Sequence, residues 1–331
     1  MELVVKFFKR QYRRVLIYTL FAALFVTSLM IGAVTDVNFE SLFRGDELMW
    51  SIMIHSRLPR TLAVVLAASG LSVAGLIMQA ISRNKFMSPS TSGTTNAASL
   101  GMLIAYIALG TSPAIIQTIF AFVFALISTL LFTSVINKLK IREVVYIPLI
   151  GMMYGGLISA ISTAIAYRYE AMQILNSFGL GSFARVGNFS VIYIITVPLF
   201  LSVLFSTKFS IIGMGEDFSK NLGVNYNKVV FFGLTLIALV SASSFVAVGG
   251  LPFIGLIIPN MTTSFYGDNL KRSIVDIMLF GADFVLICDI ISRLVIFPFE
   301  ISVSLTISVV GGIIFMIYLI RGIRHGKTKT R

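Results

Sequence analysis

Long stretches without a charged residue most constrain what this chain can fold into. An apolar α-helix of about 20 residues is long enough to cross the hydrocarbon core of a bilayer. Seven charge-free runs reach that length: Val15–Thr35, Thr61–Ser82, Phe86–Asn137, Val144–Tyr167, Val186–Thr207, Val229–Gly267 and Ile301–Ile320. An eighth hydrophobic stretch, Ser273–Ser292, carries Asp276, Asp283 and Asp289.

Two of these runs are too long for one crossing. Gly110–Pro113 divides the 52 residues of Phe86–Asn137, and Gly249–Pro252 divides the 39 residues of Val229–Gly267. Glycine and proline are the strongest breaks in a helical pattern. The sequence therefore predicts an all-α polytopic membrane protein with ten transmembrane helices.

The basic residues test this count, because loops on the cytoplasmic side are enriched in lysine and arginine. With ten spans, the inside segments carry 20 of the 26 Lys and Arg and five of the 14 acidic residues, whereas the outside loops carry six of each. Both termini are basic, so both are expected to be cytoplasmic. We expect a single transmembrane domain over 1–331: a basic N-terminus (1–14), a helical bundle (15–320) and a basic tail (321–331).

Composition excludes several classes of protein. Apolar residues make up 57% of the chain and charged residues 12%, whereas soluble proteins have about 25% charged residues. A soluble enzyme and a disordered chain are therefore excluded. Cys288 is the only cysteine, and His55 and His325 are the only histidines, so no disulfide or metal-ligand cluster is predicted. The sequence has no P-loop and no catalytic motif; we expect no catalytic residues, and ATP, if used, must bind a partner chain.

Small and helix-breaking residues suggest tight packing around a cavity. Gly70 and Ala74 lie one turn apart, so a neighbouring helix can approach closely. The same is expected of Gly151, Gly155, Gly156 and Ser159 in the fifth span and of Gly311 and Gly312 in the tenth. Segments 85–96 and 249–259 combine glycine, proline and polar residues and are poor membrane helices. Broken helices at membrane depth are tolerated where they line a cavity, and they are common in transporters.

Ionisable residues inside the bilayer are candidates for function. Asp289 and Arg293 lie four residues apart on one helix and can form a structural ion pair. Asp276 and Asp283 lie seven residues apart on a similar face. Membrane carboxylates are typical of proton-coupled carriers, so a secondary transporter that uses Asp276 and Asp283 is the alternative hypothesis.

Four motifs occur in a specific order along the chain. They are Ser56-Arg-Leu-Pro-Arg60 with Arg83-Asn-Lys85, then Gly215–Val224 (GEDFSKNLGV), then Gly255-Leu-Ile-Ile-Pro259, and finally Asp289-Ile-Ile-Ser-Arg293 followed by Pro298–Ser302 (PFEIS). In this order they resemble the FecCD-type permeases of ABC importers, which carry iron–siderophores, haem and vitamin B12. The resemblance extends from about Ser56 to Leu319.

The resemblance implies a BtuC-like ten-helix bundle that dimerises around a central path, with a cytoplasmic ABC ATPase dimer and an external substrate-binding lipoprotein as partners. It also implies that Arg57, Arg60 and Arg293 dock acidic residues of the binding protein. Guanidinium groups suit this role because they fork onto carboxylates.

The same resemblance makes the inside loop the element that couples the permease to its ATPase. Its residues are Gly215, Glu216, Asp217, Ser219, Leu222, Gly223 and Val224. The pattern predicts a short helix, a turn at Gly223 and a second short helix, with Leu222, Val224 and Tyr226 as an apolar face. The family usually has alanine where Ser219 stands.

Finer details resemble one branch of the family. Asn260, the segment Arg83–Pro89 and Tyr266–Asn269 are similar to permeases for catecholate siderophores such as petrobactin, which commonly pair with a different permease as a heterodimer. We therefore expect a multi-pass protein of a Gram-positive cell membrane that moves ferric siderophore inward. Met152, Met153, Ser159 and Ser308 are expected to line the path, and iron is carried within the siderophore rather than by a metal site of this chain.

Overall fold

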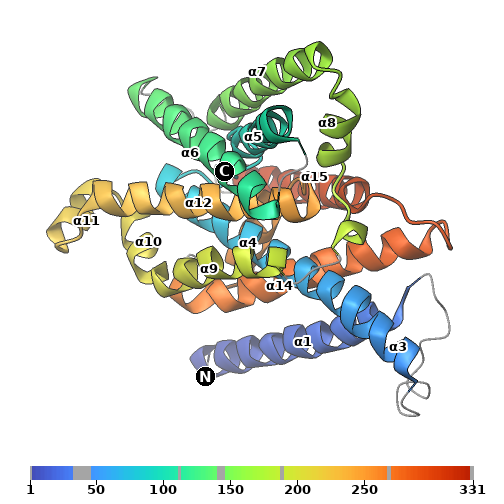
Figure 1. Ribbon diagram of the computed structural model, residues 1–331. Coiled ribbons are helices and arrows are strands. Elements are labelled where there is room, and N and C mark those ends of the chain that lie inside the picture. The colour runs from blue at the N-terminus through green and yellow to red at the C-terminus, as the bar shows by residue number, and fades with distance from the viewer. Residues whose placement is uncertain are drawn as a thin grey trace.

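The computed structural model describes residues 2–32, 46–110, 113–139, 146–186, 190–266 and 270–328, and these are helical almost throughout (Figure 1). The helices are α1 (Glu2–Met30), α3 (Glu47–Ile52), α4 (Leu58–Ser82), α5 (Thr94–Leu109), α6 (Ala114–Leu139), α7 (Tyr146–Arg168), α8 (Met172–Gly179), α9 (Ser190–Leu204), α10 (Ser206–Ile212), α11 (Glu216–Asn221), α12 (Tyr226–Val248), α13 (Ile254–Tyr266), α14 (Leu270–Leu294) and α15 (Val303–Thr328). A π-helical turn, η1 (Met53–Arg57), joins α3 to α4, and a 3-10 turn, η2 (Phe183–Arg185), precedes α9. The predicted all-α class is confirmed.

A helix occupies each of the ten predicted spans, although the sixth span consists of α9 and α10, which meet at a bend of 59°. Among the described residues, four helical segments are long and apolar enough to cross a membrane by themselves, or five if the bent pair counts as one span. These four are α3 with α4, α6, α7 and α12. The other helices contribute shorter apolar stretches, which are Arg14–Met30, Thr94–Leu109, Ile254–Thr263 and Val303–Ile317, or, in α14, a stretch interrupted by aspartates. Ten is therefore the number of predicted spans in which the structure has a helix, and length and hydropathy alone identify only four or five of them.

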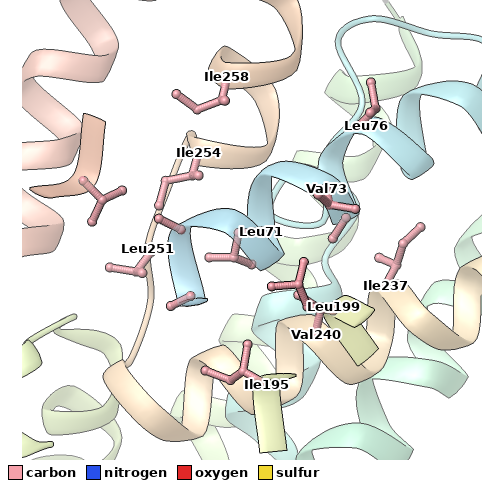
Figure 2. Packing of buried hydrophobic residues seen from close by; sticks show 14 of the residues in the cluster. Leu71, Val73, Leu76, Ile195, Leu199, Ile237, Val240, Leu251, Ile254 and Ile258 are labelled. Atoms are coloured by element: carbon pink, nitrogen blue, oxygen red, sulfur yellow. The ribbon is translucent and has the colours of Figure 1, made fainter. Parts of the chain in front are cut away.

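Helix α4 lies in the middle of the bundle and packs against α9, α12, α13 and α14 (Figure 1). Every residue from Ala67 to Gln79 is buried, as expected of a helix that is apolar all round. Figure 2 shows three α4 residues, Leu71, Val73 and Leu76, among residues of the surrounding helices: Ile195 and Leu199 of α9, Ile237 and Val240 of α12, and Ile254 and Ile258 of α13.

The contact between α4 and α13 is backbone against backbone. A Cβ atom on Gly75 would lie 2.0 Å from the carbonyl oxygen of Gly255. Pro259 lies four residues after Gly255 inside α13, and a proline has no N–H to donate to that carbonyl. The carbonyl that Pro259 leaves without its helical donor therefore lies in the space that Gly75 provides.

This arrangement corrects one prediction. The segment 249–259 was expected to be a poor helix over its whole length, but only Gly249–Phe253 is non-helical and α13 continues through Pro259. The other predicted break is confirmed: the chain leaves α4 at Arg83, which has φ 49°, and enters α5 after Gly93, which has φ 76°. Hydroxyl groups replace helical hydrogen bonds in this break, for example Ser88 with Thr91 and Thr94 with Thr129.

The small residues predicted to pack tightly do so only in part. A Cβ on Gly70 would lie 3.1 Å from Val240 Cγ1, and one on Gly151 would lie 2.1 Å from the Thr91 carbonyl oxygen. Gly156 and Gly312, in contrast, have no atom within 4 Å of such a Cβ. These two glycines therefore lie on open faces of α7 and α15.

The two ends of the bundle carry different features. Arg14 of α1 pairs with Asp276 near the start of α14, and Arg83 at the end of α4 lies beside Gly215 before α11. Phe315 of α15 contacts Phe86 with ring centroids 6.5 Å apart, which places the last turns of α15 at the same end. Following the predicted topology, we name this the inner end and the opposite one the outer end. The first half of α1 and the last turns of α15 lie toward the inner end, as an even number of crossings requires; Met1 and residues 329–331 of the basic tail lie outside the described residues.

We expect Gly75→Ala to destabilise the protein by about 1–3 kcal/mol or more, because the added methyl group overlaps the Gly255 backbone and neither helix can yield alone. Thermal unfolding of the detergent-purified chain measures the effect. Gly156→Ala is the matched control, since its added methyl group meets open space. Equal melting temperatures for the two variants would contradict the backbone contact.

Candidate functional site

The three arginines predicted to dock the binding protein meet at the outer end. Arg60 Nη2 lies 2.8 Å from Asp289 Oδ1, and its Nη1 lies 2.7 Å from Glu300 Oε1. Asp289 also pairs with Arg293, one turn further along α14. Glu300 was not singled out from the sequence, because it follows α14 in an irregular segment and its partner is 240 residues away.

Arg57 and Arg293 hold the end of α1. Arg57 Nη1 donates hydrogen bonds to the carbonyl oxygens of Leu29 and Met30, at 2.9 and 2.6 Å. Arg293 Nη1 donates to the carbonyl oxygens of Ser28 and Ile31, at 2.9 and 2.7 Å. The last carbonyls of a helix have no partner within the helix and carry partial negative charge. The two guanidinium groups therefore cap α1 and fix it to α4 and α14.

The three arginines differ in how far their side chains are exposed. Arg57 and Arg293 are only 5% and 4% exposed, whereas the Arg60 side chain is 12% exposed and its partner Glu300 is 27% exposed. The structure thus brings the three residues together but turns two of them inward. Within this cluster of Arg57, Arg60, Asp289, Arg293 and Glu300, it is Arg60 and Glu300 that present charged groups a partner could reach without rearrangement.

The membrane carboxylates of the alternative hypothesis have different environments. Asp276 is held by Arg14, whose Nη2 lies 2.9 Å from Asp276 Oδ2. Asp283 is 3% exposed, and neither of its oxygens has a hydrogen-bond partner within the described residues. In a proton relay through both carboxyl groups, Asp276 would therefore be held in its ion pair with Arg14.

The loop at the inner end has a defined local structure. Helix α11 ends at Asn221, and Gly223, two residues later, has φ 73°. Val224 N donates to Ser219 O and Gly223 N donates to Lys220 O, at 2.9 Å each, which is the Schellman arrangement. The predicted short helix and glycine turn are confirmed. The second helix is not short, since it is the long helix α12. Asn225 caps the start of α12, and its side chain accepts a hydrogen bond from Lys228 N.

The exposed face of this loop differs from the predicted one. Met214, Phe218 and Leu222 are 65%, 48% and 55% exposed and follow one another at intervals of four residues. Tyr226 instead packs partly against the core. The interval of four is present in the sequence, but it crosses the turn at Gly215, so it does not stand out as the periodicity of a single helix. We name these three residues the α11 apolar face.

Two interactions keep the α11 apolar face in place. Ser219 is buried, and its hydroxyl donates to Gly215 O at 2.6 Å on the opposite side of the helix. Lys220 and Glu216 form an i,i+4 pair at 2.8 Å, and this hydrogen bond raises the pKa of Lys220. The charged side chains are thus paired along the helix while the apolar face points away from the bundle.

A cavity of about 840 Å³ lies among α5, α7, α8, the segment before α13 and the start of α15. Its lining contains no charged residue and mixes apolar residues such as Leu175, Phe245 and Leu251 with polar ones, which include Thr95, Asn96, Ser99, Ser159, Asn176 and Ser308. Two of the predicted path residues, Ser159 and Ser308, therefore line the cavity. Met152 and Met153 do not; they are 55% and 70% exposed on α7.

Among the described residues, no three His, Cys, Asp or Glu side chains come together as a metal site would require.

The model of the FecCD transport family matches residues 20–321. The match therefore covers nearly all of the helical elements, from α1 to the end of the predicted bundle.

Individual relatives agree. The chain is 41% identical over 307 residues to the petrobactin import system permease protein YclN of Bacillus subtilis, covering 92% of this chain and 97% of the relative. It is 37% identical to the ferric-anguibactin transport system permease protein FatD of Vibrio anguillarum, covering 91% and 96%. Among solved structures, an inward-facing metal-chelate type ABC transporter shares the fold with a TM-score of 0.78 at 24% identity, covering 92% and 97%. The chain therefore belongs to the FecCD transport family.

Proposed function

We propose that this chain is the permease subunit of an ABC importer that moves ferric siderophore of the catecholate type into the cytoplasm. The observation that carries the proposal is the 41% identity, along almost the whole chain, to a permease named for petrobactin import. The second relative, named for ferric anguibactin, supports the same branch. Iron would travel within the siderophore as cargo.

The driving energy would come from a cytoplasmic ABC ATPase dimer. The chain has no P-loop, so nucleotide would bind the partner. The α11 apolar face is the surface best suited to that partner, because exposed apolar groups at the inner end gain free energy when a groove of another protein covers them. Gly215, Glu216, Asp217, Ser219, Gly223 and Val224 would shape the coupling loop that presents Leu222 and its neighbours.

A second permease would complete the translocation path. Helix α15 leaves Leu305, Val309 and Ile313 exposed on one face, and α7 leaves Met153 and Leu157 exposed. Both faces border the cavity, because Ser308 of α15 and Ser159 of α7 line it. We favour a different FecCD-type chain as the partner, and a path that includes Met152, Met153, Ser159 and Ser308.

The outer end would receive an extracellular substrate-binding lipoprotein. Arg60 would make the direct contact, while Arg57 and Arg293 would hold α1 and contribute positive potential beneath it. Glu300 competes for Arg60 in the free permease. The location would be the cell membrane of a Gram-positive bacterium, in line with the Bacillus relatives.

Asp283 keeps the proton-coupled carrier as a second candidate, because it is a buried carboxyl group without a partner among the described residues. A carrier would not need the ATPase surface on α11. Uptake that persists when the partner ATPase carries an inactive P-loop, but stops with a protonophore, would favour the carrier.

Deleting the gene is expected to abolish uptake of iron-55 supplied as a ferric catecholate siderophore, and to leave uptake of ferric hydroxamate, ferric citrate and haem unchanged. Expression of the chain from a plasmid should restore uptake. Loss for another chelate would overturn the catecholate assignment, and no loss in cells without a parallel importer would overturn the proposal.

Phe218→Asp is expected to reduce uptake to background while the protein stays in the membrane, because a charge replaces the centre of the α11 apolar face and cannot enter an apolar groove without a large desolvation cost. Asn221→Asp adds the same charge to an exposed position of the same helix and should be tolerated. Co-purification of the ATPase with each variant gives the direct readout; equal recovery with both would contradict the assignment of this face.

Glu300→Gln is expected to speed association with the binding protein, on the order of threefold at low salt, because it releases Arg60 for a partner carboxylate. Arg60→Gln should slow it by a similar factor. Glu47→Gln, an equal charge change on the exposed helix α3, is the control. Surface plasmon resonance at two ionic strengths measures the rates, and identical rates for all three variants would exclude Arg60 from docking.

A further inference from the structure

The connection between α14 and α15 carries exposed apolar side chains at the outer end. All seven residues of Leu294–Glu300 are exposed. Five of them are large and apolar, with exposed fractions from 51% to 74%: Leu294, Val295, Ile296, Phe297 and Phe299. Figure 1 shows this connection protruding from the bundle where α14 ends. We name Leu294–Phe299 the outer tip; the packing of the bundle does not use its apolar side chains.

The backbone of the outer tip forms a tight turn. Phe299 N donates to the carbonyl oxygen of Ile296 at 2.8 Å, and the same two residues form an antiparallel bridge. A hydrogen bond between residues three apart is the one that closes a β-turn. Ile301 N then donates to the carbonyl oxygen of Ser292 at 3.0 Å, which returns the chain to the side of α14. The turn therefore holds the two phenylalanines at the end of a short, closed excursion of the chain.

The base of the outer tip is fixed to two other parts of the chain. Both carboxylate oxygens of Glu300 accept from Arg60 Nη1, at 2.7 and 2.9 Å. Ser302 Oγ donates to the carbonyl oxygen of Gly181 at 2.8 Å, and Gly181 N donates to Ser304 Oγ at 3.3 Å. A surface that is already held in place loses little conformational entropy when a partner binds it. The outer tip is therefore preorganised for contact.

The position and composition of the outer tip favour a protein as the partner. The chain leaves a layer of charged residues at Arg293 and returns to it at Ile301, so the tip lies beyond that layer and not among the apolar side chains of the bundle. Residues that hold proteins at a membrane–water interface are typically Trp, Tyr, Lys and Arg, and the outer tip contains none of these. Phenylalanine beside an accessible arginine, here Arg60, is instead typical of protein interfaces.

We propose that the outer tip is an apolar docking surface for the extracellular substrate-binding protein. The partner would cover Phe297 and Phe299 with an apolar depression and place a carboxylate beside that depression, on Arg60. The inference rests on the proposed function, in which that protein delivers the chelate. It adds to the charged contact at Arg60 a second contact of a different physical kind, on a segment that carries Arg60's own partner, Glu300.

The two contacts would control different steps of docking. Charges at the rim of an interface mainly change the association rate and its dependence on salt. Buried aromatic residues contribute most of the binding free energy of an interface, and their loss is seen mainly in the dissociation rate. Arg60 would therefore speed the encounter, whereas the outer tip would set how long the binding protein stays. A binding protein that has the carboxylate but lacks the apolar depression would dissociate quickly.

The test uses the whole importer in lipid nanodiscs and surface plasmon resonance. The probe is the binding protein encoded beside the permease gene, without its lipid anchor and loaded with ferric catecholate. Phe297→Ser with Phe299→Ser is expected to raise the dissociation rate about tenfold or more at both low and high salt, because two aromatic anchors are lost. The association rate should stay within about twofold, since the charges are unchanged. Leu48→Ser, at a 63% exposed position of α3 at the same end, is the matched control and should leave both rates unchanged.

A fluorescence arm separates a protein partner from the membrane. Trp50 is the only tryptophan of the chain, so Phe299→Trp combined with Trp50→Phe gives the outer tip the only indole of the permease. Its emission should shift to shorter wavelength when the binding protein is added, because the indole leaves water. Quenching by brominated phosphatidylcholine before the binding protein is added would show insertion into the bilayer and would overturn the docking surface.

The outcomes distinguish this inference from the proposed function. A dissociation rate of the double phenylalanine variant equal to that of the unmodified importer would overturn the role of the outer tip and leave the proposed function intact. Failure of the unmodified importer to bind the loaded binding protein would instead overturn the proposed function.

Discussion

The bundle depends on the complete burial of α4. A helix that is enclosed on all sides cannot keep large side chains everywhere, so its partners approach where the residues are small. Gly75 admits the Gly255 backbone, Gly70 admits Val240, and Ser72 lies against Gly281 of α14. Ser69 adds a hydrogen bond to the carbonyl of Met278. These contacts orient α12, α13 and α14 around one axis, and the cavity and both functional ends take their positions from them.

Much of this architecture was predictable because it follows from the order of residues along the chain. Charge-free runs, basic flanks and glycine–proline breaks indicated ten helical elements with both chain ends on one side. Position along the helices also placed Arg57, Arg60 and Arg293 at one level. Their orientation was not predictable, since it depends on α1 carbonyls about 27 and 265 residues away in the sequence and on Glu300 in an irregular segment.

The errors share a physical cause. The continuation of α13 through Pro259 depends on space beside Gly75, and the inward position of Tyr226 depends on the core beneath α12; neither is local. Ser159 and Ser308 were expected to line a path as residues of the fifth and tenth predicted spans, but the cavity that they line also involves α5 and α8.

The bend between α9 and α10 has a consequence for how force would pass through the protein. The two helices meet at 59°, and α10 contacts α4, α12 and α14. Only Gly213–Gly215 separates α10 from α11. A displacement of α11 would therefore reach the bundle as a sideways push on its central helices rather than as a lengthwise push along α9. Because of the bend, α10 would transmit a displacement of α11 to the helices that it contacts, including the buried helix α4.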